Sequence, residues 1–271
     1  MVLVADARPL YARAFEERFT MPAFNVCNLE MAQGCLAAAE DERAPILLQT
    51  YPGDLEHGGD ALISLLRTLI SETSVPVVLH LDHGQDLAMI AACLRRDYAS
   101  VMFDGAELGL EKNTVETRRV ADMAHAFSSS LEGELGLFGG DHGSVLYTDP
   151  DEAERYTAES GADTLAVSVG SEHHQESRLD LKRLEAIAAR TNHPLVLHGG
   201  SGIHPDDVRE AAAFGVVKIN IGHAISKAMT EAAGEGLNRN LDHYAMLSLM
   251  REKVREVAAE KIRIMGAAGR A

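Results

Sequence analysis

The sequence of 271 residues has no tryptophan and only three cysteines. Cys27, Cys35 and Cys93 are odd in number and follow neither a CxxC nor a CxxH spacing. We therefore expect neither a disulfide framework nor a structural zinc knuckle. Sparse cysteine use of this kind is typical of a reducing compartment, and we predict a cytoplasmic location.

Long hydrophobic runs are also missing. Asp6, Arg8 and Pro9 interrupt the N-terminal stretch before it reaches the length of a signal-peptide core, and no apolar stretch approaches the roughly 20 residues of a membrane span. Basic residues are in the minority, since 25 Lys and Arg stand against 41 Asp and Glu, which gives a formal net charge of −16. This charge argues against a nucleic-acid or membrane partner, and any positive patch must be local.

The sequence does contain a regular alternation of short apolar runs and helical patterns. The apolar runs, eight in number, are 23–27, 45–49, 75–82, 100–104, 129–135, 163–169, 193–198 and 216–221. The stretches between them have apolar residues three and four apart, and they are 29–40, 60–71, 86–96, 111–126, 150–160, 179–190 and 205–214. Eight such units in about 235 residues predict an α/β fold, a (β/α)8 TIM barrel, rather than a doubly wound sheet.

The remaining segments fit one domain, residues 1–271, with a C-terminal helical extension. A long charged helix is predicted at about 245–264, after the barrel is complete. No linker, repeat or shift of composition suggests a second domain. The irregular stretch 136–148 is long for a compact domain, and loops of that length are usually lids or mobile connections.

Three predicted strands end in a histidine: His83, His173 and His198. Strand ends meet at one rim of a barrel, and three imidazoles with an open position are the ligands of a catalytic zinc ion. Each histidine alone is more often a capping or surface residue, but their shared placement favours a metal site. This expectation depends on the predicted fold.

Carboxylates accompany these histidines. Asp82 precedes His83, and in this position it would either orient the ligand or transfer a proton. His80 shares the strand face of Asp82 and is more often an interior hydrogen-bonding residue than a ligand. Asp104 ends another strand, and a further strand contains Glu132 and Glu134.

Glycines follow the last two predicted strands. Gly199, Gly200 and Ser201 follow one, and the run 220–222 leads into the next helix. Backbone N–H groups at these places commonly hold a phosphate in barrel enzymes. Tight turns between strands and helices also use glycine, so a purely structural role stays open.

Several of these runs together resemble the class II, zinc-dependent ketose-bisphosphate aldolases. They are HLDHG, VMFDG, Glu132–Gly140 (ExELGxxGG), a GxxH in the sixth strand, LHGGS and KIN. This family includes fructose-bisphosphate and tagatose-bisphosphate aldolases. The resemblance extends from PAFNVCNLE near residue 22 to KIRIMGAAGR at the end. The segment 50–54 is closer to the tagatose-bisphosphate branch.

The resemblance implies a role for each matching residue. His83, His173 and His198 would bind Zn2+, Glu134 would approach the metal when it shifts, and Asp104 and Glu132 would support the ligands. The substrate-binding residues would be Asn25, Thr50, Gly170, His174, Gly199, Gly200, Ser201, Asn220, Ile221, Gly222 and His223. A monovalent cation such as Na+ or K+ would lie near the phosphate.

The implied reaction is reversible cleavage of a phosphorylated ketose to dihydroxyacetone phosphate and an aldehyde, through a zinc-stabilised enediolate. Zinc takes the part that a Schiff-base lysine has in other aldolases. Asp82 would accept the proton of the C4 hydroxyl, and a second group would protonate the enediolate. The resemblance also implies a homodimer or homotetramer.

Three positions depart from the family pattern. The loop that normally carries a glutamate reads Gly139–Gly143 (GGDHG), so Asp141 or His142 would be the second proton-transfer group. His174 stands where glycine is usual, and His223 where threonine is usual. We therefore predict a reshaped anion site and a substrate that differs from fructose or tagatose bisphosphate; neutral drift is the alternative.

Two other functions remain open. The first is a non-catalytic relative that binds metal and anion without turnover. The second is a zinc hydrolase on the same barrel, which is disfavoured because the first strand lacks a His-x-His pair.

Overall fold

The computed structural model describes residues 4–137, 146–171 and 176–271. Eight parallel strands pair in sequence order, and β1 pairs with β8 to close a barrel. The predicted (β/α)8 fold is therefore confirmed. The strands are β1 (Met21–Asn25), β2 (Ile46–Thr50), β3 (Val77–Gly84), β4 (Ser100–Phe103), β5 (Ser130–Leu135), β6 (Thr164–Val167), β7 (Leu195–Leu197) and β8 (Val216–Ile221).

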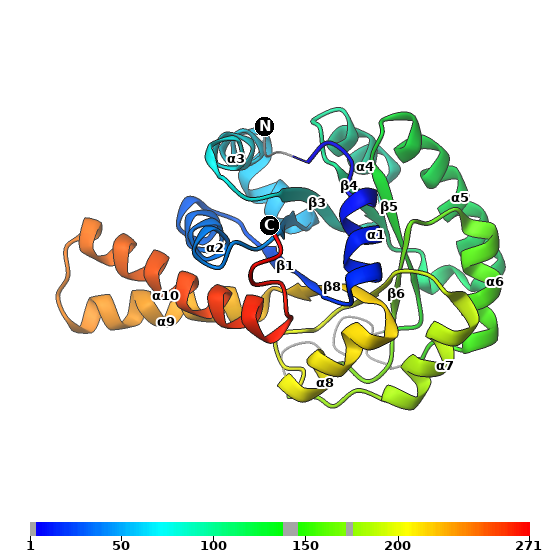
Figure 1. Ribbon diagram of the computed structural model, residues 1–271. Helices are drawn as coiled ribbons and strands as arrows, with labels where there is room; N and C mark the ends of the chain where they lie inside the picture. The colour runs from blue at the N-terminus through cyan, green and yellow to red at the C-terminus, as the bar shows by residue number, and fades with distance from the viewer. Residues whose placement is uncertain (1–3, 138–145, 172–175) are drawn as a thin grey trace.

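Helices surround this barrel (Figure 1). Several begin at an Asp or Asn whose side chain accepts a backbone N–H of the first turn, which is the usual start signal of a helix. None of the described helices combines the length and apolarity needed to cross a membrane. The helices are α1 (Arg8–Glu17), α2 (Leu29–Asp41), α3 (Pro52–Glu72), α4 (Leu87–Leu94), α5 (Leu110–Ala126), α6 (Pro150–Ser160), α7 (Leu181–Thr191), α8 (Pro205–Ala211), α9 (His223–Asn238) and α10 (His243–Ile264).

Two helical segments differ from the sequence-based expectation. Helix α1 was not predicted, because Asp6, Arg8 and Pro9 obscure its apolar face. Helix α3 begins at Pro52 instead of residue 60, and its two parts meet at a kink at Gly59. The predicted C-terminal helix is present as α10, and it packs antiparallel to α9 in a hairpin that projects from the barrel (Figure 1).

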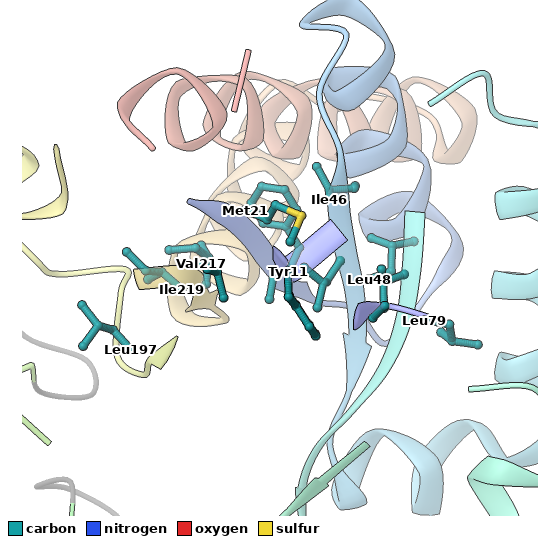
Figure 2. Packing of buried hydrophobic residues seen from close by; sticks show 14 of the residues in the cluster. Tyr11, Met21, Ile46, Leu48, Leu79, Leu197, Val217 and Ile219 are labelled. Carbon is teal, nitrogen blue, oxygen red and sulfur yellow. The ribbon is translucent and has the colours of Figure 1, made fainter. Parts of the chain in front are cut away.

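The core lies inside the strands and between the strands and helices. Figure 2 shows part of this packing, in which Tyr11 of α1 lies among residues of β1, β2 and β8 such as Met21, Leu48 and Ile219. The hydroxyl of Tyr11 lies 3.2 Å from Oγ of Ser100, the first residue of β4. Helix α1 therefore covers the N-terminal end of the barrel. The C-terminal end is the one at which a functional site can form.

Candidate active site

The end of β3 supplies two side chains to the barrel mouth, Asp82 and His83. His80 and Asp82 share one face of the strand and are both buried. His83 has a φ of 50°, in the left-handed region, and the pairing of β3 with β4 shifts register between Leu81 and Gly84. This break in the strand alternation allows two consecutive residues, Asp82 and His83, to line the same pocket.

Three side-chain amides hold the Asp82 carboxylate. Its Oδ2 accepts from Nδ2 of Asn25 (2.9 Å) and Nε2 of Gln49 (3.1 Å), and its Oδ1 accepts from Nδ2 of Asn220 (2.8 Å). Burial alone would raise the pKa of Asp82, but nearby His83 and Lys218 and the amide hydrogen bonds leave it below its usual value. Asp82 is therefore a fixed, ionised group at the centre of the mouth.

Next to Asp82, imidazoles and carboxylates converge. Ligand atoms of Asp82, His83 and His198 lie within 4.8 Å of one another, and so do those of His83, Asp104 and Glu134. The rings of His83 and His198 meet edge to face with centroids 4.7 Å apart. The structure thus brings together two of the three predicted histidine ligands and both predicted carboxylates. His173 lies outside the described residues.

The charges of this cluster favour a cation. Burial alone would lower the pKa of His83, but Asp82, Asp104 and Glu134 outweigh it and raise this pKa to about 10. Burial would raise the pKa of Asp104, but its hydrogen bond with His83, 3.2 Å from Nδ1 to Oδ2, brings it to about 2. An excess of carboxylate oxygen over positive charge is what a divalent cation would neutralise.

Glu134 gives the clearest sign of a missing positive partner. It is fully buried, and burial raises its pKa well above the usual value. Among the described residues neither of its carboxylate oxygens accepts a hydrogen bond; Nδ1 of His198 lies 3.5 Å from Oε2. Buried polar atoms in this condition are rare in proteins, and a bound cation would satisfy them. The donor set therefore fits a divalent metal ion.

A buried polar layer supports the cluster from inside the barrel. Nε2 of His198 lies 3.0 Å from Oε1 of Glu132, whose carboxylate also accepts from Nζ of Lys218 at 2.8 and 3.1 Å. Nδ1 of His80 lies 2.8 Å from Oγ of Ser100. Because Glu132 engages Nε2 of His198, Nδ1 is the ring nitrogen that faces Glu134 and the mouth.

Backbone turns after β7 and β8 form a small cradle. Gly199 has a φ of 66°, and a Cβ on Gly200 would collide with the side chain of Ile219. Gly222 precedes α9 without a side-chain cap, and the Oγ of Ser201 accepts the backbone N–H of Ala224 in the first turn of α9. The close packing demands glycine, and the start of α9 presents N–H groups to an anion.

Asp82 and His83 of the cluster and the glycine cradle line one cavity of about 450 Å³. The residues that line it are Asn25, Cys27, Met31, Tyr51, Asp54, Asp82, His83, Gly199, Ser201, Asn220, Gly222, His223 and Ser226. Most of the predicted substrate-binding residues are therefore in one place. Gly200 supports the lining from behind, and Gly170, with a φ of 104°, lies at the end of the β6 segment.

Two predicted substrate-binding residues lie elsewhere. Thr50 is buried, and its Oγ1 lies 2.9 Å from the hydroxyl of Tyr98 instead of facing the cavity. Ile221 belongs to the apolar core. In both cases the preceding residue, Gln49 or Asn220, faces Asp82, because neighbouring residues of a strand point to opposite faces. His142 and His174 lie outside the described residues, so the structure places neither.

Sequence reasoning missed Gln49, Tyr51 and Asp54. Gln49 lies within an apolar run and was read as part of it. Asp54 occupies the first turn of α3, where its Oδ2 accepts the backbone N–H of Tyr51 at 3.0 Å. Burial raises the pKa of Asp54 to about 6, and the charge of Asp82 adds to this rise. The pattern of a proline followed two residues later by aspartate could have indicated this helix start.

Comparison with known proteins agrees with this architecture. The family model of class-II fructose-bisphosphate aldolase matches residues 5–270. The chain is 34% identical to a fructose-bisphosphate aldolase of Thermus caldophilus, covering 96% of this chain and 97% of that protein. It is 33% identical to a sulfofructosephosphate aldolase of Alkalicoccus urumqiensis, covering 98% of each.

A solved structure gives the same picture. The crystal structure of the YdjI aldolase from Escherichia coli K12 superposes with a TM-score of 0.90 at 30% identity, covering 99% of both chains. The predicted resemblance is thereby confirmed over nearly the whole length. With this fold, a polar mouth and a match from residue 5 to residue 270, the chain belongs to the class II fructose-bisphosphate aldolase family and is a carbon–carbon lyase.

Proposed function

We propose that the protein is a zinc-dependent aldolase that reversibly cleaves a phosphorylated ketose to dihydroxyacetone phosphate and an aldehyde. The observation that carries this proposal is the position of Asp82, an ionised carboxylate held by three amides directly beside a cluster of metal-binding side chains. A base next to a cation is what cleavage of a carbon–carbon bond beside a carbonyl requires.

The metal would be held by His83 and His198 together with His173, and Glu134 and Asp104 would complete or support the site. The buried carboxylate oxygens of Glu134 fit this role because they accept no hydrogen bond from any described residue. Bound there, Zn2+ would act as a Lewis acid and stabilise the negative charge that develops next to the substrate carbonyl during cleavage.

Asp82 is the base that takes the proton from the C4 hydroxyl of the ketose, and it returns this proton in the condensation direction. Its two oxygens are fixed by Asn25, Gln49 and Asn220, so the carboxylate cannot rotate away from the reacting carbon. The lowered pKa of Asp82 keeps it ionised at neutral pH, as a base must be.

The phosphate of the dihydroxyacetone phosphate half would lie in the cradle of Gly199, Ser201 and Gly222. Backbone N–H groups there and at the start of α9 bind an anion without a lysine or arginine. His223, the first residue of α9, would add a donor whose charge depends on pH. We also propose a monovalent cation, Na+ or K+, near this phosphate.

A second proton-transfer group must protonate the dihydroxyacetone phosphate carbon. We propose His142 or Asp141 for this step, in place of the usual glutamate. Both lie in the segment 138–145, outside the described residues, so their support is chemical: a histidine has an unperturbed pKa of about 6.5 and exchanges protons near neutrality.

Assembly and location complete the proposal. We propose a homodimer or homotetramer of the single domain 1–271 that acts in cytoplasmic carbohydrate metabolism such as glycolysis. The hairpin of α9 and α10 supports self-association, because Leu237 and Tyr244 near its turn are 69% and 74% exposed. Exposed apolar side chains on a projecting element are typical of subunit contacts.

One experiment tests this function: metal analysis of the purified protein, coupled to aldehyde release from a panel of ketose phosphates. We expect about one zinc ion per chain and cleavage that the Asp82→Ala variant loses. Exchange of the C3 proton of dihydroxyacetone phosphate provides a second readout. Bound metal with neither proton exchange nor aldehyde release would contradict the proposal and favour a non-catalytic relative that binds metal and anion.

A further inference from the structure

The substrate cavity has two ends of different chemistry. One end is the cradle after β7 and β8, where Gly199 and Gly222 present backbone groups. Asp82 and His83 lie at the end of β3. The other end is the start of α3, where Tyr51 and Asp54 line the cavity. A ketose with its phosphate in the cradle and its C4 hydroxyl at Asp82 would extend its remaining carbons toward the end of the cavity that Tyr51 and Asp54 line.

The end at α3 is unsuited to an anion. Among the described residues that line the cavity there is no lysine or arginine, and two carboxylates, Asp54 and Asp82, are present. Oδ2 of Asp54 accepts the backbone N–H of Tyr51, whereas Oδ1 accepts no hydrogen bond from any described residue. One carboxylate oxygen in the cavity wall is thus available to a ligand hydroxyl.

The surroundings of Asp54 keep its carboxylate in place. Pro52 begins the helical segment, and the hydrogen bond from Tyr51 N–H ties the carboxylate to the helix start. Asp54 is mostly buried, and its pKa is raised to about 6, so it carries a negative charge at neutral pH while it shares a cavity with Asp82. A second phosphate here would meet a charge of the same sign.

We propose that Asp54 determines substrate specificity: it accepts a hydrogen bond from a hydroxyl of the aldehyde half of the substrate and excludes a phosphate or sulfonate from that end. The substrate class is a ketose monophosphate with an uncharged, hydroxylated tail. This inference depends on the proposed function, because it places the single phosphate in the cradle and the reacting carbon at Asp82.

The test compares fructose 1-phosphate with fructose 1,6-bisphosphate, and tagatose 1-phosphate with tagatose 1,6-bisphosphate, on the zinc-loaded protein. We expect kcat/KM to favour a monophosphate by about tenfold or more. Asp54→Asn should move this ratio toward the bisphosphate by about tenfold, because it removes the charge and keeps an acceptor for Tyr51 N–H. Asp54→Ser is a second variant that retains an acceptor oxygen.

Glu56→Gln is the matched control. It removes the same charge two residues further along the same helical segment, but Glu56 is exposed and does not line the cavity. Its ratio should equal that of the wild type. Equal effects of Asp54→Asn on both kinds of sugar, or a wild-type preference for the bisphosphate, would overturn the inference.

A binding measurement separates this inference from the proposed function. The reduced, hexitol forms of the four sugars have no carbonyl and cannot be cleaved, so calorimetry reports their affinity alone. The wild type should bind hexitol monophosphates more tightly than bisphosphates, and Asp54→Asn should lose this difference. Without aldehyde release or proton exchange the proposed function fails, yet the hexitol affinities still decide the role of Asp54.

Discussion

Asp82 and Asp54 belong to one cavity but to two regions of the molecule, the barrel interior and the helical rim. Asp82 is held by amides from β1, β2 and β8, and its pKa is below the usual value. Asp54 is held by one backbone N–H of its own helix, and burial raises its pKa to about 6. Strand pairing fixes the first carboxylate, and a local helix start fixes the second.

This difference teaches where each property of the enzyme resides. Side chains on paired strands keep their positions when the loops change conformation, so they are suited to catalysing the cleavage of the carbon–carbon bond. Groups on the segments that follow the strands can change without disturbing the barrel, and they suit discrimination between substrates. We therefore expect substitutions in the interior to affect kcat or metal binding, and substitutions at the rim to affect KM or specificity.

The largest effect is expected from Asp82→Asn. This change removes the base and keeps the size of the side chain, so kcat should fall by about 10³-fold. Metal content should change little, since Asp82 is not among the proposed ligands. The melting temperature should fall, because the asparagine NH2 group would face an amide donor where the carboxylate oxygen accepted a hydrogen bond. Assays of aldehyde release, with zinc analysis of the same samples, measure kcat and metal content. Retention of more than a tenth of the activity would contradict the assignment of Asp82.

Glu134→Gln should have two opposite effects. Metal affinity should fall about 10- to 100-fold, because the variant has lost the buried negative charge. The metal-free protein at pH 8 should become more stable: the raised pKa of Glu134 means that stability is lost as the pH rises from about 4.5 through the folded-state value, and glutamine has no proton to lose. Chelator titration and thermal unfolding of metal-free samples test these outcomes.

Gly59→Ala tests the rim. Gly59 has φ 52° and ψ −150°, a combination essentially confined to glycine, and a Cβ there would meet no atom within 4 Å. The expected loss of about 1–3 kcal/mol in unfolding free energy is therefore conformational. The segment before the kink carries Asp54, so KM should rise as well. Gly109→Ala is the control, since Gly109 also has a positive φ with an open Cβ position but does not line the cavity.

The smallest effect concerns acid stability of the metal-free protein. Burial lowers the pKa of His80 and of His193 in the folded state. Below pH 6.5 the unfolded chain protonates these two histidines and the folded chain does not, so each one contributes a fall of at most about 1.4 kcal/mol per pH unit to the unfolding free energy. The raised pKa values of Glu134 and Asp54 act in the opposite direction, so the contribution of a histidine is the difference between the slopes of the wild type and its variant. Urea titrations from pH 7.5 to 5.5 measure the slope. His193→Asn should reduce the contribution that acidification makes to the loss of unfolding free energy. A variant slope equal to the wild-type slope would contradict this explanation.

The sequence predicted the parts of the molecule that strand periodicity controls. All eight strands, the mouth residues Asp82, His83 and His198, and the glycine turns follow from apolar runs and the polar residues that end them. The approximate bounds agree because each strand is buried on both faces and reads as one apolar run.

What the sequence did not reveal depends on short or irregular elements. The first part of α3 has fewer than two helical turns before the kink at Gly59, too short for a periodic signal. Thr50 was implied by the family resemblance, and because β2 is buried throughout, its hydropathy does not show that Gln49, rather than Thr50, faces Asp82. His83 shares a pocket with Asp82 only because the β3–β4 register shifts there, and tertiary contacts alone determine such a shift.

The left-handed backbone of His83 has a consequence for how the protein handles its ion. A residue other than glycine in this conformation costs on the order of 1–3 kcal/mol, which the packed barrel overcomes during folding. The imidazole is held by its hydrogen bond with Asp104, 3.2 Å from Nδ1 to Oδ2. Capture and exchange of different divalent ions should therefore proceed without refolding, and reconstitution after chelation should be rapid and complete.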